Sequence, residues 1–330
     1  MGMWTRPLIR MFAAMVVAVT CAAEFVGGCS DGGAGSSASS STTIGVQASG
    51  VPGISETTVT TGGQVAGTTG ITGSTVTSGV QAPSTTGIAG PTVTTGAATV
   101  TNPWFPLQPG YQAIELGTLN RGGTSLEHRR VWTVTDVTKV IDGLRAVLVL
   151  DQNIDAGEIS EQAVDYLAID TDGSILYLGS YTEAYEGGQF VNAADAWLAG
   201  VNAVSGMLMP GDPQPGSGSF TQADVPGQEF STAKVLKTGQ SLCVPFDCYT
   251  DVLVIQEGDE YKYFASGVGE LKIEPHYSGG EQEKLELINA VRLSPEGLAE
   301  FSAEAMRLDE HARQTSTKVF GNSEPAEQPS

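Results

Sequence analysis

The first hundred residues of this 330-residue chain lack the side chains that a folded core needs. No aromatic residue occurs between Val26 and Pro103, and Glu56 is the only charged residue from Gly32 to Val100. A segment this rich in Ser, Thr and Gly cannot bury enough apolar surface to offset the entropy lost on folding. The foldable part therefore begins near residue 101, and it is long enough for one sizeable domain.

The start of the chain has the pattern of a secretory signal peptide. Arg6 and Arg10 precede an apolar run over 11–23, which is too short to cross a bilayer as a helix. The run ends in "VGGC", with the cysteine at Cys29. Small residues before a cysteine resemble the lipobox of bacterial lipoproteins. The resemblance implies cleavage just before Cys29, acylation of its thiol and retention at a membrane by two or three acyl chains.

Two details of this leader differ from the commonest lipobox. Glu24 interrupts the apolar run, and Val26 stands where Leu is more usual. Cleavage by an ordinary signal peptidase near Ala23 and an uncleaved anchor therefore remain alternatives. The tract that follows is interpreted as an inert tether, with an O-glycosylated stalk as the alternative. The predicted organisation is a signal peptide at 1–28, a disordered tether at 29–100, a globular domain at 101–315 and a disordered tail at 316–330.

The charge balance excludes one class of partner. The chain has a formal net charge of −21, and nearly all of its charged residues lie beyond residue 100. Such a surface repels the phosphate backbone of nucleic acids and the head groups of anionic lipids. We therefore expect no nucleic-acid partner. Solubility outside the cytoplasm explains the acidity, and a cation-binding surface is the alternative.

The segments after residue 101 alternate between β-forming runs and turns. Runs rich in Val, Ile, Thr and Tyr follow one another at short spacing, and turn sequences such as Asp142-Gly143 and "DTDGS" at 170–174 separate them. This pattern is typical of antiparallel neighbours joined by hairpins. We predict a mainly β domain of about nine or ten strands, built as a single antiparallel curved sheet or open barrel.

Two segments depart from the strand pattern. The stretch over 192–209 mixes small and apolar residues, and it is interpreted as a partly buried excursion with a helical turn. Near the end, Ser294 and Pro295 suit the cap and first position of a helix. Apolar residues then recur at helical spacing from Leu298 to Leu308. One C-terminal helix that packs on the sheet or closes its end is therefore expected.

Four sequence blocks of the domain resemble conserved blocks of an uncharacterised family of bacterial secreted and lipoprotein domains. They are "NPWFPLQPG", "DYLAIDTDGSILYLG", "AWLAGVNAVSGMLMPGDPQPG" and "KYFASGVGELK". The chain departs from the family pattern at Tyr166-Leu167, where the family has Trp-Tyr, at Ser180, where it has Glu, and at Asp212, which is inserted. The resemblance implies one exported β-rich domain and supplies no activity.

Cys243 and Cys248 form a C-x4-C pair around Pro245. In an exported protein this spacing predicts a small disulfide loop. A metal site would need further ligands nearby, and the three histidines of the chain are scattered. We expect neither a metal nor a cofactor.

One strand offers candidate acid–base residues. Alternation along "EISEQAVDYLAID" places Glu161 and Asp165 on the same face as Leu167 and Ile169. If this face is internal, the two carboxylates point into a cavity and can perform acid–base catalysis or bind a cation. If the strand twists, both meet solvent.

Trp197, Met207 and Met209 are the candidate residues for an apolar pocket. The leading functional hypothesis is a lipid-anchored protein of the bacterial cell envelope that binds a small or apolar ligand, or an envelope protein, without catalysis. The alternatives are a hydrolase-like enzyme that uses Glu161 and Asp165, and a purely structural envelope protein.

Overall fold

Fifteen strands and two helices make up most of the described part of the chain, which comprises residues 100–227, 232–277 and 281–328 of a computed structural model. The predicted signal peptide, Cys29 and all but the last residue of the predicted tether lie outside the described residues. Within the described ranges, no helix combines the length and the apolar character that a membrane span requires.

The strands cover most of the domain that was predicted to be β-rich. Their bounds are β1 Tyr111–Arg121, β2 Thr124–Ile141, β3 Leu144–Asp155, β4 Glu158–Ile169, β5 Ile175–Glu186, β6 Gln189–Asn192, β7 Ala196–Leu198, β8 Val204–Met209, β9 Ser219–Thr221, β10 Ala223–Asp224, β11 Thr232–Cys243, β12 Cys248–Glu257, β13 Glu260–Ala265, β14 Gly269–Pro275 and β15 Gln282–Arg292. The helices are α1 Pro295–Thr315 and α2 Thr317–Phe320.

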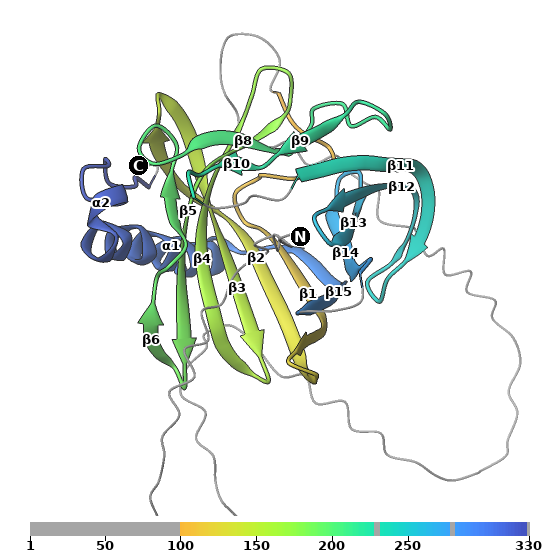
Figure 1. Ribbon diagram of the computed structural model, residues 1–330, viewed down its shortest axis with the longest axis horizontal. Helices are drawn as coiled ribbons and strands as arrows, with labels where there is room; N and C mark the ends of the chain where they lie inside the picture. The colour runs from red at the N-terminus through yellow and green to blue at the C-terminus, as the bar shows by residue number, and fades with distance from the viewer. Residues whose placement is uncertain (1–99, 228–231, 278–280, 329–330) are drawn as a thin grey trace, which may run out of the picture. The chain divides into compact units, whose positions relative to one another are not determined.

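All of these strands belong to one antiparallel sheet (Figure 1). Its order is β10-β8-β5-β4-β3-β2-β1-β15-β14-β13-β12-β11-β9, with β6 and β7 attached to β5. Because β8 also contacts β9, the two ends of this order approach each other and the sheet nearly closes into a barrel. The predicted fold class, a single curved antiparallel sheet or open barrel with a C-terminal helix, is confirmed.

The number of strands exceeds the predicted nine or ten. Most of the additional strands are short, because β6, β7, β9 and β10 have two to four residues each. The stretch over 192–209 forms β7 and β8 in place of a helical turn. In β1, Gly117 passes so close to β15 that an added Cβ would lie 1.8 Å from the carbonyl oxygen of Lys284. A glycine inside a strand can thus mark close backbone contact rather than a chain break.

The two faces of the sheet bury different clusters. Alternation along β3 sends Val147 and Val149 to the interior cluster and Leu148 and Leu150 to the opposite face. On that opposite face, which is the outside of the barrel, α1 packs over β2 to β5 (Figure 1). Neither of the two described helices thus contributes to the interior cluster, which consists mainly of side chains from the strands.

Helix α1 begins as the sequence predicts. The side chain of Ser294 accepts a hydrogen bond from the amide of Gly297, and Pro295 occupies the first turn. A buried ion pair fastens the helix to the sheet, since Nζ of Lys139 lies 2.7 Å from Oδ1 of Asp309. The hydroxyl of Tyr166 donates to the same carboxylate at 2.8 Å.

The residues after α1 do not form the predicted disordered tail over the range that the structure describes. Phe320 in α2 is fully buried against the outer cluster. Further along, the backbone of Glu327 exchanges hydrogen bonds with Thr138 of β2, at 2.7 and 2.8 Å. A buried aromatic side chain and a strand-like bridge thus help to hold this segment on the barrel.

The segment before β1, residues 102–110, crosses one end of the barrel and is called the strap here. The side-chain amide of Asn102 donates to the carbonyl groups of Gly173 and Pro210, both at 2.9 Å. The carbonyl of Pro103 accepts a hydrogen bond from the amide of Gly267 at 2.7 Å. The strap is therefore bonded both to the β4–β5 turn and to the β13–β14 turn.

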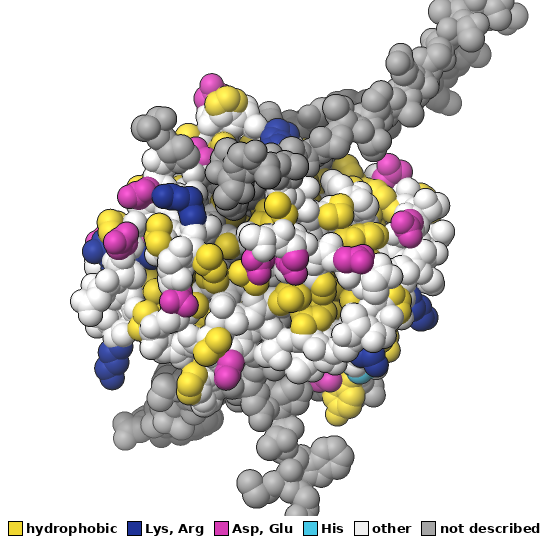
Figure 2. Space-filling model, turned by 90° about the horizontal axis from the view of Figure 1, so that it is seen from above, with side chains coloured by type: hydrophobic (Ala, Val, Ile, Leu, Met, Phe, Trp, Pro, Cys, Tyr) yellow, Lys and Arg dark blue, Asp and Glu magenta, His cyan; other side chains and the backbone are white. Residues whose placement is uncertain are grey.

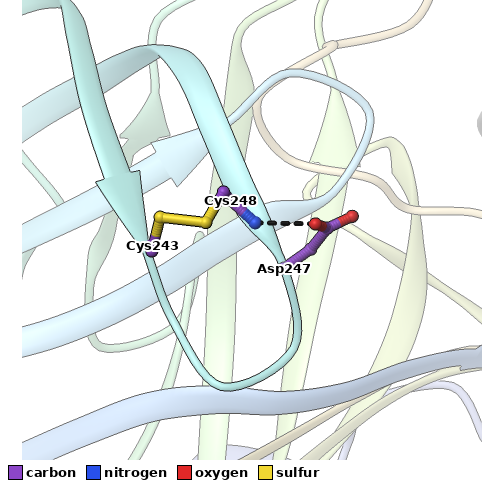
Figure 3. The surroundings of a disulfide bond; sticks show 3 residues. All are labelled: Cys243, Asp247 and Cys248. Carbon is purple, nitrogen blue, oxygen red and sulfur yellow. Dashed lines mark hydrogen bonds between the residues drawn. A yellow bond between two sulfur atoms is a disulfide. The ribbon is translucent and has the colours of Figure 1, made fainter.

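The predicted disulfide is confirmed. Cys243 ends β11 and Cys248 begins β12, and the two sulfur atoms are bonded (Figure 3). Asp247, between them, accepts a hydrogen bond at 2.7 Å from the amide of Cys248, and its own carbonyl accepts one from Val244. The bond closes the hairpin that the C-x4-C spacing indicated.

Figure 2 shows the molecule from above the view of Figure 1. Hydrophobic side chains lie close together near the middle of this face, and acidic side chains are placed among and around them. Acidic residues are thus not restricted to the rim of the domain. A second set of acids lies inside the barrel.

Candidate functional site

A group of charged side chains lies inside the barrel, next to the apolar interior cluster. We call it the interior ionic cluster. Its members are Glu115, Arg130, Asp151, Glu257, Glu260, Lys262, Glu270 and Glu283. Six carboxyl groups thus surround two cations. A buried excess of one charge is costly unless hydrogen bonds, protons or a bound ion compensate it.

Arg130 is the centre of this cluster on the β1–β2 side. Its Nε and Nη2 atoms lie 3.0 to 3.1 Å from the carboxylate of Asp151, so the ion pair is bidentate. Its Nη1 atom donates to Oε1 of Glu270 at 2.9 Å. These contacts hold the pKa of Arg130 well above its ordinary value, although burial alone would lower it.

Glu115 faces Arg130 across the strand pair but receives no hydrogen bond from it. Its Oε2 atom lies 3.6 Å from Nη1 of Arg130, and it has no hydrogen-bond partner among the described residues. The side chain is only 3% exposed. Burial, followed by the nearby negative charge of Glu270, raises the pKa of Glu115 well above its ordinary value.

A β-bulge sets the position of Glu115. The register between β1 and β15 shifts between Ile114 and Glu115, whereas the pairing of β1 with β2 is regular. Bulges commonly change the direction of a side chain next to a functional site. Here the bulge leaves the carboxyl group of Glu115 beside a cavity.

The cavity has a volume of about 40 Å³ and lies between the strap and strands β1, β2 and β14. Phe105 and Pro106 of the strap and Trp132 of β2 form apolar walls. The rings of Phe105 and Trp132 meet edge to face, with centroids 5.4 Å apart. Glu115 and Glu270 supply carboxyl groups to the same cavity, and Arg130 also lines it. Small-molecule sites typically combine such apolar walls with a few polar groups.

A glycine lets the strap approach this cavity. Gly269 has a φ angle of +93°, and an added Cβ would lie 3.0 Å from Cδ of Pro106. Any other residue here would strain the backbone and press against the strap. Glu270 follows directly, so the turn that receives Pro106 also delivers a carboxyl group to the cavity.

A histidine joins Glu283 of the interior ionic cluster to a further acid, Asp155. Nδ1 of His128 lies 2.6 Å from Asp155, and Nε2 lies 2.8 Å from Glu283. Burial alone would lower the pKa of His128, but the hydrogen bonds and charges of both carboxylates raise it to about 9. The imidazole is therefore a cation at neutral pH and offsets part of the acidic excess.

The β12–β13 side of the cluster is arranged around Lys262. Its Nζ atom lies 2.7 Å from Glu257 and 4.0 Å from Glu260. Burial raises the pKa of Glu260 to about 7, although the charge of Lys262 acts in the opposite direction. Glu260 thus titrates near neutral pH.

Glu161 and Asp165 lie on the same face of β4 as Leu167, as the alternation of the strand predicts. This face is the interior one, which the sequence had left open. Their neighbour Leu167 belongs to the interior cluster, whereas Tyr166 belongs to the cluster under α1. Glu161 is 5% exposed and accepts a hydrogen bond from Asn153 at 3.2 Å. Asp165 is half-buried and accepts one from Tyr177 at 2.6 Å. The cavity described above is lined by other residues.

Trp197, Met207 and Met209 contribute to different parts of the structure. Met209 is fully buried in the interior cluster and pairs with Ile175. Trp197 packs edge to face on Tyr177, with centroids 4.8 Å apart, in a separate small cluster. Met207 is half-buried opposite Leu176.

The residues around the cavity were not singled out from the sequence, although a signal was present. Glu115 interrupts an apolar strand in "YQAIELG", and Arg130 precedes Trp132 by two positions in "RRVWTV". Both are charged side chains on the buried face of an alternating strand. Their meeting with Glu270 depends on the pairing of β1 with β15 and then β14, which the sequence alone does not fix.

No group of three or more His, Cys, Asp or Glu side chains in the described part of the chain is arranged to hold a metal ion. Comparisons of the chain with protein-family models, with curated proteins and with solved structures gave no match.

Proposed function

We propose that this chain is a lipid-anchored protein of the bacterial cell envelope whose barrel binds a small ligand without catalysis. The ligand site is the cavity under the strap. One observation carries the proposal: an apolar wall faces the same cavity as the buried carboxyl group of Glu115, whose Oε2 atom has no hydrogen-bond partner among the described residues.

The geometry of the strap supports a binding role. The strap is bonded to turns that belong to opposite parts of the strand order, the β4–β5 turn and the β13–β14 turn. Leu107 of the strap and Tyr111, the first residue of β1, are both buried in the interior cluster. A cavity held between a fixed segment and a barrel wall is largely pre-formed, which reduces the ordering cost of binding.

The membrane anchor rests on the leader pattern that ends at Cys29. The low-complexity tract after it would act as a tether, with an r.m.s. span of roughly 45–50 Å for about 70 residues. Such a span would keep the acidic domain clear of lipid head groups. The anchor and the binding site are independent parts of the proposal.

The two alternatives have less support in the geometry. A hydrolase that uses Glu161 and Asp165 needs a substrate space beside them, and the described cavity is formed by other residues. A purely structural protein has no use for a buried carboxyl group whose Oε2 lacks a hydrogen-bond partner among the described residues, since such a group destabilises the fold. We therefore favour binding.

The methyl group of Ala113 lines the cavity and gives a direct test. The full-length protein with 13C-labelled alanine methyl groups is titrated with ethanol, acetamide, ethylammonium and acetate, which differ in charge and have three or four heavy atoms. We expect at least one probe to shift the Ala113 signal while the signal of Ala163, on the interior face of β4, stays in place. No saturable shift of Ala113 with any probe would overturn the proposal.

A matched pair of variants controls for indirect effects. Ala113→Val adds two methyl groups inside the cavity, and Ala163→Val makes the same change on another interior strand. We expect loss of binding in the first variant and unchanged binding in the second. Equal binding by both variants would place the ligand elsewhere.

A further inference from the structure

The charges around the cavity identify the kind of ligand, if the proposed binding function is correct. We propose that the cavity binds the ammonium group of a small primary amine, which donates hydrogen bonds to Glu115 and Glu270. The amine's short alkyl part packs against Trp132 and Phe105. The steps below give the hydrogen bonds, the charge and the size that lead to this assignment.

The hydrogen bonds of Arg130 are directed away from Glu115. Nε and Nη2 are directed to Asp151, and Nη1 is directed to Glu270. Oε2 of Glu115 consequently remains an acceptor without a donor among the described residues, although it is buried. A ligand with N–H groups can donate the hydrogen bond that the guanidinium does not make to this oxygen. A primary ammonium group has three N–H donors.

The charge of the site favours a cation over a neutral donor. Three carboxyl groups contact Arg130, those of Glu115, Asp151 and Glu270. One guanidinium cannot neutralise three carboxylates, so a second positive charge in the cavity would stabilise them. The excess negative charge of these carboxylates would repel an anionic ligand.

The walls and the volume define the rest of the ligand. Aromatic rings attract a cation through their faces and accept alkyl groups by simple packing. A volume of about 40 Å³ is small. Since one water molecule needs a cavity volume of roughly 10–15 Å³, the cavity has room for about three non-hydrogen atoms. Ethylammonium has this size and is a suitable probe.

Binding of a cation here is coupled to a proton. The groups that face Glu115 are Arg130 from β2, Asp151 from β3, Glu270 from β14, Glu283 from β15 and Tyr111 from its own strand. Burial and the acidic members of this set raise the pKa of Glu115, so its carboxyl group keeps a proton to higher pH than an exposed glutamate does. An ammonium ion displaces that proton, and its affinity should therefore rise with pH.

The test is a titration of the full-length protein with ethylammonium chloride at constant ionic strength, read from the Ala113 methyl signal. Ethanol is the neutral probe of the same size and acetate the anionic one. A ligand of three heavy atoms can reach only about millimolar affinity. We expect ethylammonium to bind at least tenfold more tightly than ethanol or acetate, and its affinity to increase from pH 5 to pH 8.

Glu115→Gln tests the contact itself, and Glu274→Gln is its control. Glu274 is on β14, as Glu270 is, but it is not among the residues that line the cavity. Its carboxylate contacts Tyr263 and Lys272. Both variants replace one ionisable carboxyl group by an amide of the same shape. We expect Glu115→Gln to weaken ethylammonium binding at least tenfold and Glu274→Gln to leave it unchanged. Circular dichroism checks that both variants are folded.

The outcomes separate this inference from the proposed function. If ethanol or acetate binds as tightly as ethylammonium, or if Glu115→Gln binds ethylammonium as the parent does, the ammonium assignment is wrong and a binding cavity remains. If Glu115→Gln does not fold, the comparison of the three probes on the parent protein still tests whether the cavity prefers an ammonium group. If no probe shifts Ala113, both proposals fail.

Discussion

Glu115 and Arg130 are direct partners across the β1–β2 pair, yet the guanidinium bonds to Asp151 and Glu270 and leaves Oε2 of Glu115 at 3.6 Å. A buried carboxyl group beside a cation that does not donate a hydrogen bond to it is an energetic cost to the empty fold. Such a cost at the wall of a cavity is what a bound ligand can remove, and it underlies the function proposed above.

Removal of Arg130 should be strongly destabilising. Arg130→Met leaves three buried carboxyl groups without their shared cation, and breaking a buried pair costs about 3–5 kcal/mol. The control is Arg145→Met, because the side chain of Arg145 is 60% exposed and its loss should cost less than about 0.5 kcal/mol. Urea unfolding at pH 7 measures both. Similar midpoints for the two variants would show that the cluster is not held by Arg130.

The protein should become more stable when the pH is lowered from 7 to 5. The folded-state pKa of Glu260 is about 7 against an ordinary value of 4.5, because burial favours the neutral form. The folded state then holds a proton that the unfolded state has lost, so the free energy of unfolding falls as pH rises between these values. Glu260→Gln should flatten the slope. A parent protein whose stability rises from pH 5 to pH 7 would contradict this.

His128 adds a second pH-dependent contribution at higher pH. Its pKa is raised from 6.5 to about 9 by Asp155 and Glu283, against the effect of burial. Its stabilising contribution is complete below about pH 6.5 and is lost as pH rises through 9. From 1.36 kcal/mol per pKa unit, the total is on the order of 3 kcal/mol. An NMR titration of the imidazole measures the pKa, and a value near 6.5 would contradict the network.

The ion pair of Lys139 with Asp309 should hold α1 on the barrel. Lys139→Met leaves a buried carboxylate with only the hydroxyl of Tyr166 and the amide of Ala326 as donors among the described residues. We expect a loss of about 3 kcal/mol and faster amide exchange in α1. Lys318→Met, at an exposed position, is the control and should change neither. Unchanged exchange in the first variant would mean that apolar packing alone holds the helix.

The lipid anchor can be tested separately from the barrel. Cys29→Ser removes the proposed acylation site, so the protein should move from the membrane to the soluble fraction, with a mass that lacks the acyl chains. A variant that sediments with membranes as the parent does would exclude the lipoprotein assignment. The ligand site would be unaffected by that result.

The sequence predicted local features well. Strand alternation placed Glu161 and Asp165 on the same face as Leu167, Ser294 marked the start of α1, and the spacing of Cys243 and Cys248 indicated the disulfide. Each of these depends on neighbours within a few residues. The number of strands and the packed segment after α1 were missed, because short strands and single buried aromatic residues leave little periodic signal.

The candidate site was missed for a different reason. Glu115, Arg130 and Glu270 come from three strands, and their meeting depends on the order β2-β1-β15-β14. A charged residue in an apolar strand is visible in the sequence, but its partner is not. The bulge at Glu115, which decides where its carboxyl group lies, also has no sequence mark such as glycine.

The most direct measurement is an intermolecular nuclear Overhauser effect between ethylammonium and the Ala113 methyl group. We predict this contact in the parent protein near pH 8, together with one to the indole of Trp132, and its loss in Glu115→Gln. Contacts of saturating ethylammonium only with methyl groups outside the cavity, or no contact at all, would contradict the binding site proposed here.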